Sequence, residues 1–325
     1  MDTKRRKLIY KILKDYYQER KTQQFIADKY GISRIMVSRF ISKAISEKMV
    51  EIIIHPPEDP FVEMEREVEL KYGLKEVLIT PSFQDNQKTI DELGKAGANY
   101  LLRNLKGNES ISVSWGRTLF ALVNALPKLN FPDINIIQMI GGLGYPEEQI
   151  SGNELVRRMA NAFNGHPKLL NSPGIVASKE ISEALKNDPQ NASTLSLARK
   201  ADFSLVGIGN FSGASLVQNP NRILTENDIK SLEKKGVVGD ISLNFINKNG
   251  ELIEDEVNER IIGISIEDIK NISRVIGISG GEYKFETIKA ALKGELIDVL
   301  ITDKNTAEKL MNQATKLSSV PSVNG

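Results

Sequence analysis

The chain has 325 residues, of which 40% are hydrophobic, so it is long enough for two domains with buried cores. It contains no cysteine and two histidines, which excludes disulfides and thiol chemistry and leaves few ligands for zinc, so we expect no metal and no cofactor. No apolar run approaches the roughly 18 residues of a membrane helix, and the N-terminus lacks the apolar core of a signal peptide. We therefore predict a cytoplasmic protein with no membrane partner.

The net charge of +1 hides an asymmetry along the chain. Residues 1–55 carry 13 Lys and Arg against 6 Asp and Glu, whereas residues 56–325 carry 30 against 36. A small basic segment joined to a larger acidic one indicates a nucleic-acid-binding module fused to a second domain. A solvated basic helix would give the same charge. We assign residues 1–55 to a DNA-binding domain and residues 56–325 to an effector-binding and oligomerisation domain.

Helical spacing of apolar residues predicts a first helix over residues 4–20. Thr22 is a suitable N-cap for a second helix that ends near Tyr30, and Ser33 can cap a third helix that runs to about Lys48. Gly31 stands at the turn between them, where a positive φ is cheap only for glycine. Residues 51–55 are β-prone and are interpreted as the strand that ends a winged module. The prolines of HPPEDPF then mark the domain boundary.

The stretch from residue 23 to residue 40 fits a helix-turn-helix. Ala27 is small where the two helices must cross closely, and apolar residues occupy the positions that a three-helix core requires, namely Ile26, Ile32, Val37 and Phe40. In this motif the third helix lies in the major groove of DNA. The alternative is a small helical bundle with an exposed basic face.

The predicted DNA-binding residues lie on the exposed side of this third helix and are Ser33, Arg34, Ser38, Arg39 and Lys43. Arg34 and Arg39 can each bond guanine O6 and N7. Ser33, Lys43 and the basic cluster 4–7 are expected to contact phosphates instead.

After a helix predicted over residues 61–72, short β-branched runs alternate with helical stretches. The clearest runs are 76–80, 110–114, 134–140, 203–208, 275–279 and 299–302. This alternation predicts an α/β domain with a mostly parallel sheet and helices on both faces.

Glycines follow several of these predicted strands. Gly116, Arg117 and Thr118 open a helix, where backbone N–H groups, a hydroxyl and a guanidinium form a phosphate cradle. Ligands of open α/β sheets bind at the carboxyl ends of strands, although each glycine pair is also typical of a simple turn. The predicted effector-binding residues are Gly116, Arg117, Thr118, Gln138, Gly141, Gly142, Gly209, Asp240, Gly281 and Lys284.

Three of the polar or aromatic candidates have more than one interpretation. Asp240 is a candidate contact to sugar hydroxyls or a surface carboxylate. Gln138 is either a ligand contact or a core residue, and Trp115 is expected to serve core packing.

Taken together, these segments resemble the SorC family of bacterial sugar-responsive transcriptional regulators. The resemblance covers nearly the whole chain and is carried by ISRIMVSRFI, VSWGRTL, IIQMIGG, ADFSLVGIG, VVGDI and VIGISGGEYKFETIKAALKGELIDVLITDKNTAEKL. It implies a Rossmann-like effector domain similar to sugar-phosphate isomerases and CoA-transferases. It also implies homo-oligomers, dimers or tetramers, that bind palindromic operators with an affinity changed by phosphorylated sugars.

The family's pattern places the phosphate at the junction 116–118 and effector contacts at Asp240 and Lys284. Some members carry a lysine immediately before the paired glycines, and this lysine forms a Schiff base with the sugar aldehyde. Ile140 occupies that position here, and an aliphatic side chain cannot form an imine.

The sequence therefore predicts a DNA-binding transcriptional regulator, a repressor of a carbohydrate or nucleoside catabolic operon that responds to a phosphorylated sugar. The alternative is a sugar-phosphate isomerase-like enzyme on the same fold. Such an enzyme needs a positioned acid or base, and no histidine lies in the glycine-rich junctions. An activator or quorum-signal sensor with the same architecture stays open.

Overall fold

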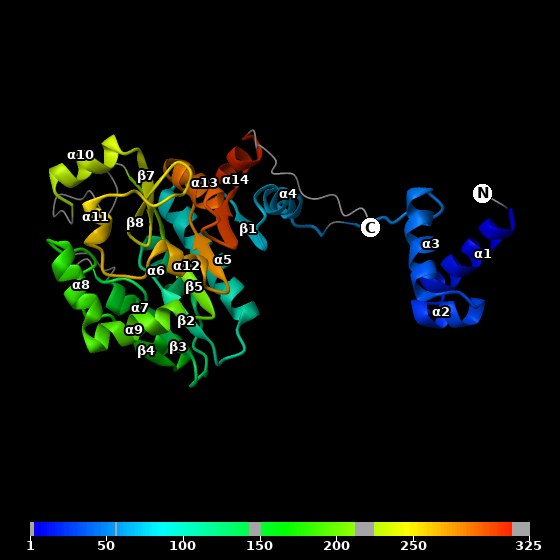
Figure 1. Ribbon diagram of the computed structural model, residues 1–325, viewed down its shortest axis with the longest axis horizontal. Coiled ribbons are helices and arrows are strands. Elements are labelled where there is room, and N and C mark those ends of the chain that lie inside the picture. The colour runs from blue at the N-terminus through cyan, green and yellow to red at the C-terminus, as the bar shows by residue number, and fades with distance from the viewer. Residues whose placement is uncertain (1–2, 56, 143–150, 212–223, 314–325) are drawn as a thin grey trace. The chain divides into compact units, whose positions relative to one another are not determined.

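The computed structural model describes residues 3–55, 57–142, 151–211 and 224–313 (Figure 1). The chain divides into two compact units, 1–58 and 59–325, which we call the N-terminal and the C-terminal unit. The sequence-based boundary lies three residues earlier. None of the helices in the described ranges combines the length and apolar character that a bilayer crossing requires.

The N-terminal unit is built from helices. They are α1 (Thr3–Leu13), a π-helical turn (Lys14–Gln18), α2 (Gln23–Tyr30) and α3 (Arg34–Ser46). Thr22 and Ser33 cap α2 and α3, because their hydroxyl oxygens accept bonds of 3.2 Å from the N–H groups of Phe25 and Met36. Gly31 adopts a φ of 65° between these helices. The sequence predicted both caps and the left-handed turn correctly.

The prediction of a strand over residues 51–55 is wrong. Within the described residues, these five form no backbone hydrogen bond and pair with no strand. Ile52, Ile53 and Ile54 are 57%, 73% and 84% exposed. β-branched residues favour an extended backbone, but a strand also needs a partner, and the N-terminal unit offers only helices.

The C-terminal unit contains a parallel sheet whose strands, in spatial order, run β1-β10-β9-β5-β2-β3-β4. Their bounds are β1 (Glu76–Thr80), β2 (Ser110–Val113), β3 (Asn135–Gln138), β4 (His166–Lys168), β5 (Phe203–Val206), β9 (Val275–Ile278) and β10 (Val299–Asp303). Every described pair of neighbours in this sheet is parallel, for example with Ile111 beside Ile136 and Phe203. The predicted α/β class is therefore correct.

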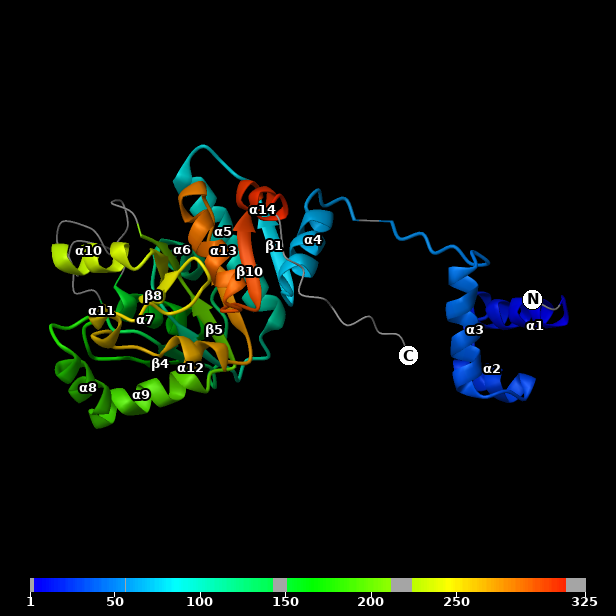
Figure 2. The same ribbon diagram turned by 45° about the horizontal axis from the view of Figure 1, so that its top comes forward.

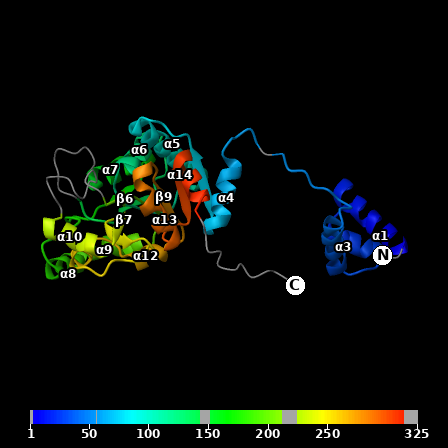
Figure 3. The same cartoon turned by 90° about the horizontal axis from the view of Figure 1, so that it is seen from above.

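Helices cover both faces of the sheet (Figure 3). They are α4 (Val62–Tyr72), α5 (Asn86–Asn104), α6 (Arg117–Ala125), α7 (Gly152–Phe163), α8 (Lys179–Asn187), α9 (Pro189–Arg199), α10 (Glu226–Lys234), α11 (Glu256–Glu259), α12 (Ile266–Lys270), a 3₁₀ turn (Glu282–Lys284), α13 (Phe285–Lys293) and α14 (Lys304–Met311). Helices α4 and α14 pack together beside β1 (Figure 2).

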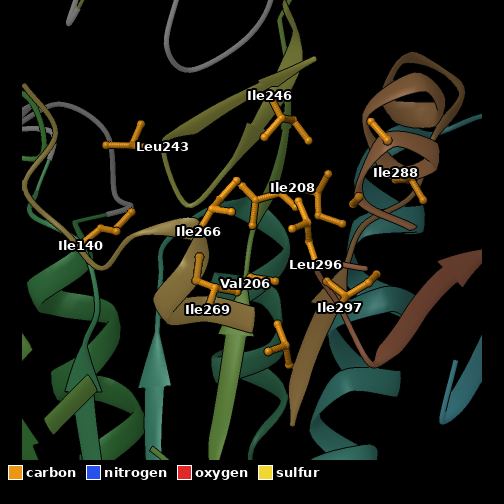
Figure 4. Close-up of a cluster of buried hydrophobic side chains, with 14 of the residues drawn as sticks. Ile140, Val206, Ile208, Leu243, Ile246, Ile266, Ile269, Ile288, Leu296 and Ile297 are labelled. Carbon is orange, nitrogen blue, oxygen red and sulfur yellow. The ribbon is translucent and has the colours of Figure 1, made fainter. Parts of the chain in front are cut away.

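Two hydrophobic cores follow from the alternation of side chains along the strands. On one face, Ile111 and Val113 of β2 pack with residues of α5, α6 and α7. On the other face lies a larger cluster that includes residues of α9, α12 and α13, part of which Figure 4 draws. Ser112 points to this second side and donates or accepts a 2.9 Å bond with the Ser204 hydroxyl, so its buried polar group is satisfied.

The strand predicted over residues 203–208 is two strands. β5 ends at Val206, and β6 (Ile208–Asn210) leaves the parallel sheet to pair antiparallel with β7 (Val237–Ile241), which in turn pairs with β8 (Asn244–Asn247). The break falls at Gly207, whose N–H donates a 2.9 Å bond to the Ser114 hydroxyl beyond the end of β2. A continuous apolar run hides such a break, because both strands are buried.

Candidate DNA-binding surface and effector cleft

The N-terminal unit has the packing of a helix-turn-helix. Ile26, Ala27, Val37 and Phe40 are buried, at most 5% exposed, and join residues of α1 in one core, while Ile32 is partly buried against it. The buried carboxylate of Asp15, which lies in the π-helical turn, accepts a 2.9 Å salt bridge from Lys29. This bond from Lys29 holds the pKa of Asp15 below its ordinary value. The ion pair thus ties α2 to the end of the first helix.

All five predicted DNA-binding residues are exposed on or beside α3. They are Ser33, Arg34, Ser38, Arg39 and Lys43. The oxygen of the Ser33 hydroxyl accepts the capping bond, which leaves its O–H free to donate to a phosphate oxygen. Lys43 lies 3.6 Å from Glu47, an exposed pair that water screens. Two arginines and a lysine are therefore exposed on this helix, where they can contact a partner such as DNA.

Apolar residues on the same helix were not part of the prediction. Ile35 is 68% exposed and Met36 43% exposed near the N-terminus of α3. Methyl groups at such positions can contact the C5-methyl group of thymine in the major groove. The guanidinium of Arg5 lies 5.4 Å from the centre of the Phe40 ring, so α1 brings one basic residue of its cluster beside α3.

The C-terminal unit contains a cleft of about 710 Å³, including the part open to solvent. It is lined by Ile90, Trp115, Gly116, Arg117, Thr118, Leu119, Ile140, Gly207, Ile208, Gly209, Asn210, Asp240, Ser242, Leu243, Ile278, Tyr283 and Lys284. β2 and β5 are neighbours near the middle of the sheet. From β2 the chain continues to β3 on one side of this pair, and from β5 it later reaches β9 on the other side. The cleft therefore opens where the connections diverge, at the carboxyl ends of adjacent strands, which is the usual ligand position in open α/β sheets.

The first wall of the cleft is the start of α6. Gly116 is its N-cap with a φ of 148°, a conformation that favours glycine, and no side chain caps this helix. The Phe120 N–H makes the first intrahelical bond, of 2.9 Å to the Gly116 carbonyl oxygen. The N–H groups ahead of it point out of the helix, as at any N-terminus, and favour an anion. The exposed Arg117 and the buried Thr118 stand in the same turn.

The lining of the cleft also holds a carboxylate and an amine. Asp240 is 7% exposed, and its Oδ2 accepts a 2.9 Å bond from the Leu243 N–H. Burial raises the pKa of Asp240 to about 6, against the Leu243 bond and the charge of Lys284. Burial, together with the charge of Arg117, lowers the pKa of Lys284 to about 8. Gly209 pairs with Asp240 across β6 and β7, and an added Cβ there would collide with the Asp240 carboxylate.

The cleft thus brings together Gly116, Arg117, Thr118, Gly209, Asp240 and Lys284 from the predicted effector set. The other four predicted residues do not line it. The Gln138 amide is buried, because its Nε2 donates to the Ile140 carbonyl oxygen at 3.0 Å and its Oε1 accepts from the Leu170 N–H at 3.1 Å. Gln138 therefore fits the core interpretation.

The remaining three glycines serve close packing or positioning. A Cβ on Gly141 would collide with the Pro173 carbonyl, and the Gly142 N–H donates to the Ser172 carbonyl oxygen at 3.0 Å. The Gly281 N–H donates to Oδ2 of the buried Asp303 at 2.6 Å, just before Tyr283 and Lys284. Gly281 thus positions a cleft residue without lining the cleft.

Several lining residues were missed from sequence. Ile90, Leu243 and Ile278 form an apolar wall of the cleft together with Ile140. Ile140 stands at the position where the resemblance to the SorC family implies a lysine in some members. Ile140, Ile208 and Leu243, which Figure 4 labels, line the cleft and also belong to the larger apolar cluster. Trp115 was expected to serve core packing alone, but it also lines the cleft. Its buried Nε1 donates to the Gly141 carbonyl oxygen at 3.1 Å.

Residues 59–312 match the family described as "Putative sugar-binding domain", and the chain belongs to this SorC-like family. The match begins where the C-terminal unit begins, covers this unit to residue 312, and includes all the residues of the cleft. The relatives that match 96% and 94% of this chain are named regulators, so this protein is a regulator and not an enzyme.

The chain is 28% identical to the deoxyribonucleoside regulator of Bacillus subtilis, over 96% of this chain and 99% of that protein. It is also 28% identical to the sorbitol operon regulator of Klebsiella pneumoniae, over 94% and 98% of the two chains. The crystal structure of that full-length regulator, SorC, superposes with a TM-score of 0.72 over 94% of this chain and 98% of SorC. A DeoR family transcriptional regulator from Listeria monocytogenes, 27% identical, has a TM-score of 0.71 over 78% and 100%.

Proposed function

We propose that this protein represses a carbohydrate or nucleoside catabolic operon in the cytoplasm and that a phosphorylated sugar in the cleft changes its affinity for the operator. The observation that carries the proposal is the uncapped start of α6 facing a cleft that also contains Arg117 and Lys284. Two of the relatives are named a sorbitol operon regulator and a deoxyribonucleoside regulator, which agrees with an effector of this class.

The charges of the cleft favour a phosphate at one end. Burial lowers the pKa of Lys284, the positive charge of Arg117 lowers it further, and the charge of Asp240 opposes both. A phosphate between the two cations would remove this repulsion and receive charge-assisted bonds from both, together with N–H groups of α6.

The sugar carbons would extend from this end over the apolar wall. Ile140 offers the sugar no polar group, and the indole N–H of Trp115 is already bonded to the Gly141 carbonyl oxygen. Asp240, in contrast, offers a carboxylate that can accept hydrogen bonds from sugar hydroxyls. Ile140 cannot form an imine, so binding in this protein is non-covalent at that position.

DNA binding is assigned to the exposed face of α3. A two-fold symmetric dimer, alone or as one half of a tetramer, would present two copies of this helix to the half-sites of a palindromic operator. The effector can change operator affinity only through a different affinity for two conformations or assembly states of the protein. We infer that closure of the cleft around the phosphate favours one of them.

The test is a thermal-shift screen of phosphorylated sugars on the full chain and on two variants, Lys284→Met and Lys293→Met. A ligand at 100 times its Kd stabilises the folded state by about 2.7 kcal/mol, which a melting curve detects. Loss of a charged hydrogen bond at Lys284 costs about 1.5–3 kcal/mol, or roughly 10- to 150-fold in affinity.

Lys293 is the control, because it is exposed at the far end of α13. Lys293→Met is expected to bind like the unaltered chain. The proposal fails if no phosphorylated sugar raises the melting temperature, or if both variants bind the same sugar with unchanged affinity.

A further inference from the structure

The segment 51–55 has the chemistry of a strand and lacks a partner. It reads Glu-Ile-Ile-Ile-His, and its three isoleucines are the most exposed run of large apolar side chains in the described part of the N-terminal unit. Its N–H and C=O groups make no hydrogen bond within the described residues. Exposed apolar side chains and free backbone groups in one extended stretch form the template on which another strand pairs.

The segment is anchored at one end and stopped at the other. Met49 and Val50 pack against the core of the N-terminal unit, and the Met49 N–H donates to the Ala44 carbonyl oxygen at 2.8 Å. Pro56 and Pro57 follow, and proline cannot donate to a ladder. The length available for pairing is therefore limited to the five residues between them.

We propose that this segment pairs antiparallel with the same segment of a second copy of the chain, about a two-fold axis at Ile53. In this register Ile53 faces Ile53 of the second copy, and Ile52 faces Ile54. Glu51 then stands opposite His55, so a carboxylate meets an imidazole that can donate to it at both ends of the ribbon. The segment is thus complementary to itself in charge and in apolar pattern, as a two-fold interface requires.

The consequence concerns the spacing of the DNA-reading helices. Because the ribbon begins directly after Val50, which packs against the core, pairing would hold two N-terminal units at a fixed separation. Half-sites of an operator are read at a fixed separation as well. The ribbon would therefore set which operator spacing the protein accepts.

The chain contains no cysteine, so an introduced cysteine reports only on its own position. In the proposed register the Cα atoms of two residues at position 53 lie roughly 4.5–5.5 Å apart, within the range that a disulfide spans. Two residues at position 54 lie diagonally, roughly 8 Å apart, which is too far for a disulfide.

The experiment uses full-length Ile53→Cys and Ile54→Cys, oxidised mildly without DNA and separated on a non-reducing gel. We expect Ile53→Cys to form a covalent dimer roughly tenfold faster than Ile54→Cys, or more. Ile54 is the stringent control because it is the more exposed of the two, and random collision would favour it. Equal rates, a faster rate for Ile54→Cys, or no dimer from Ile53→Cys would overturn the proposal.

The register is checked with a mixture of Glu51→Cys and His55→Cys chains. We expect a covalent dimer in the mixture and little in either variant alone, because position 51 faces position 55 of the other copy. Crosslinking of each variant with itself would indicate a different register and contradict the two-fold axis at Ile53. A segment covered instead by its own C-terminal unit would give no dimer in any of these samples, which also overturns the proposal. Since no DNA is present, failure of operator binding would not affect the result.

Discussion

The DNA-binding face and the effector cleft are built in opposite ways. The face of α3 comes from one continuous stretch, in which Ser33 caps the helix that carries Arg34 and Arg39. The cleft comes from residues as far apart as Ile90 and Lys284, joined only by the order of the strands. A site on one helix depends on that helix and its core, whereas a site at strand ends depends on the whole sheet.

The largest expected effect tests whether the two sites depend on separate cores, and it comes from disrupting the core of the N-terminal unit. Phe40→Ala removes a buried ring and is expected to cost about 3–5 kcal/mol. A unit of this size has a total stability of roughly 3–9 kcal/mol. We expect the N-terminal unit to melt separately and early, operator binding to be lost, and sugar-phosphate binding to stay within about twofold, measured by calorimetry on one preparation.

Ile35→Ala is the matched control, since it lies on the same helix and is exposed. Its stability is expected to change by no more than about 0.5 kcal/mol. Loss of effector binding in Phe40→Ala would show that the two units do not fold independently.

A smaller expected effect distinguishes base recognition by Arg39 from a general contribution of positive charge to DNA binding. Arg39→Ala is expected to weaken operator binding by about 1–3 kcal/mol and to relax selectivity at one base position. Lys48→Ala removes the same charge beyond the C-terminal end of α3 and is expected to leave selectivity unchanged. Binding to a set of single-base operator variants measures both. Unchanged affinity and selectivity in Arg39→Ala would remove its assigned role.

The pH dependence of effector binding sharpens the account of the cleft. A phosphate binds the charged form of Lys284, whose pKa of about 8 in the free protein lies below its ordinary value because of burial and Arg117. Raising the pH through 8 removes this charge, so affinity should fall roughly tenfold per unit above pH 8 and be flat between about 7 and 7.5. Titration calorimetry in buffers of different ionisation enthalpy would also detect proton uptake near pH 8. A Kd that stays constant to pH 9.5 would contradict this arrangement.

The smallest effect tests a single cap. Thr22→Ala removes the oxygen that accepts from the Phe25 N–H and should lower the stability of the N-terminal unit by about 1 kcal/mol. Thr22→Ser keeps the oxygen and should recover most of it. The melting temperature of the N-terminal transition is the measurement, and equal losses in both variants would assign the effect to the methyl group.

The same contrast explains what could be predicted from the sequence. Caps, turns and helix cores are local, so Thr22, Gly31, Ser33 and Val37 were placed correctly. The strand predicted over 299–302 was recognised because its β-branched run is buried on both sides. The segment 51–55 has the same composition but no neighbour, and a pattern in one chain does not show whether a neighbour exists.

In the cleft, the helix start at 116–118 could be found because its three residues are adjacent. Gly141 and Gly142 gave the same signal but pack against residues 172–174 instead. Gln138 is a core residue and Ile140 lines the cleft, which the sequence could not decide, because the partners of the Gln138 amide, Ile140 and Leu170, are brought to it by the fold. Tyr283 and Ile90 carried no signal at all, since their place depends on tertiary packing alone.

The most direct test of the account measures operator affinity with and without a saturating sugar that binds the cleft, in phosphorylated and unphosphorylated form. Coupling between two such sites is typically about 1–3 kcal/mol, so we predict that the phosphorylated sugar changes the operator Kd by roughly 5- to 150-fold and that the unphosphorylated sugar does not. An operator Kd that is the same at saturation with every phosphorylated sugar bound by the cleft would contradict the central claim.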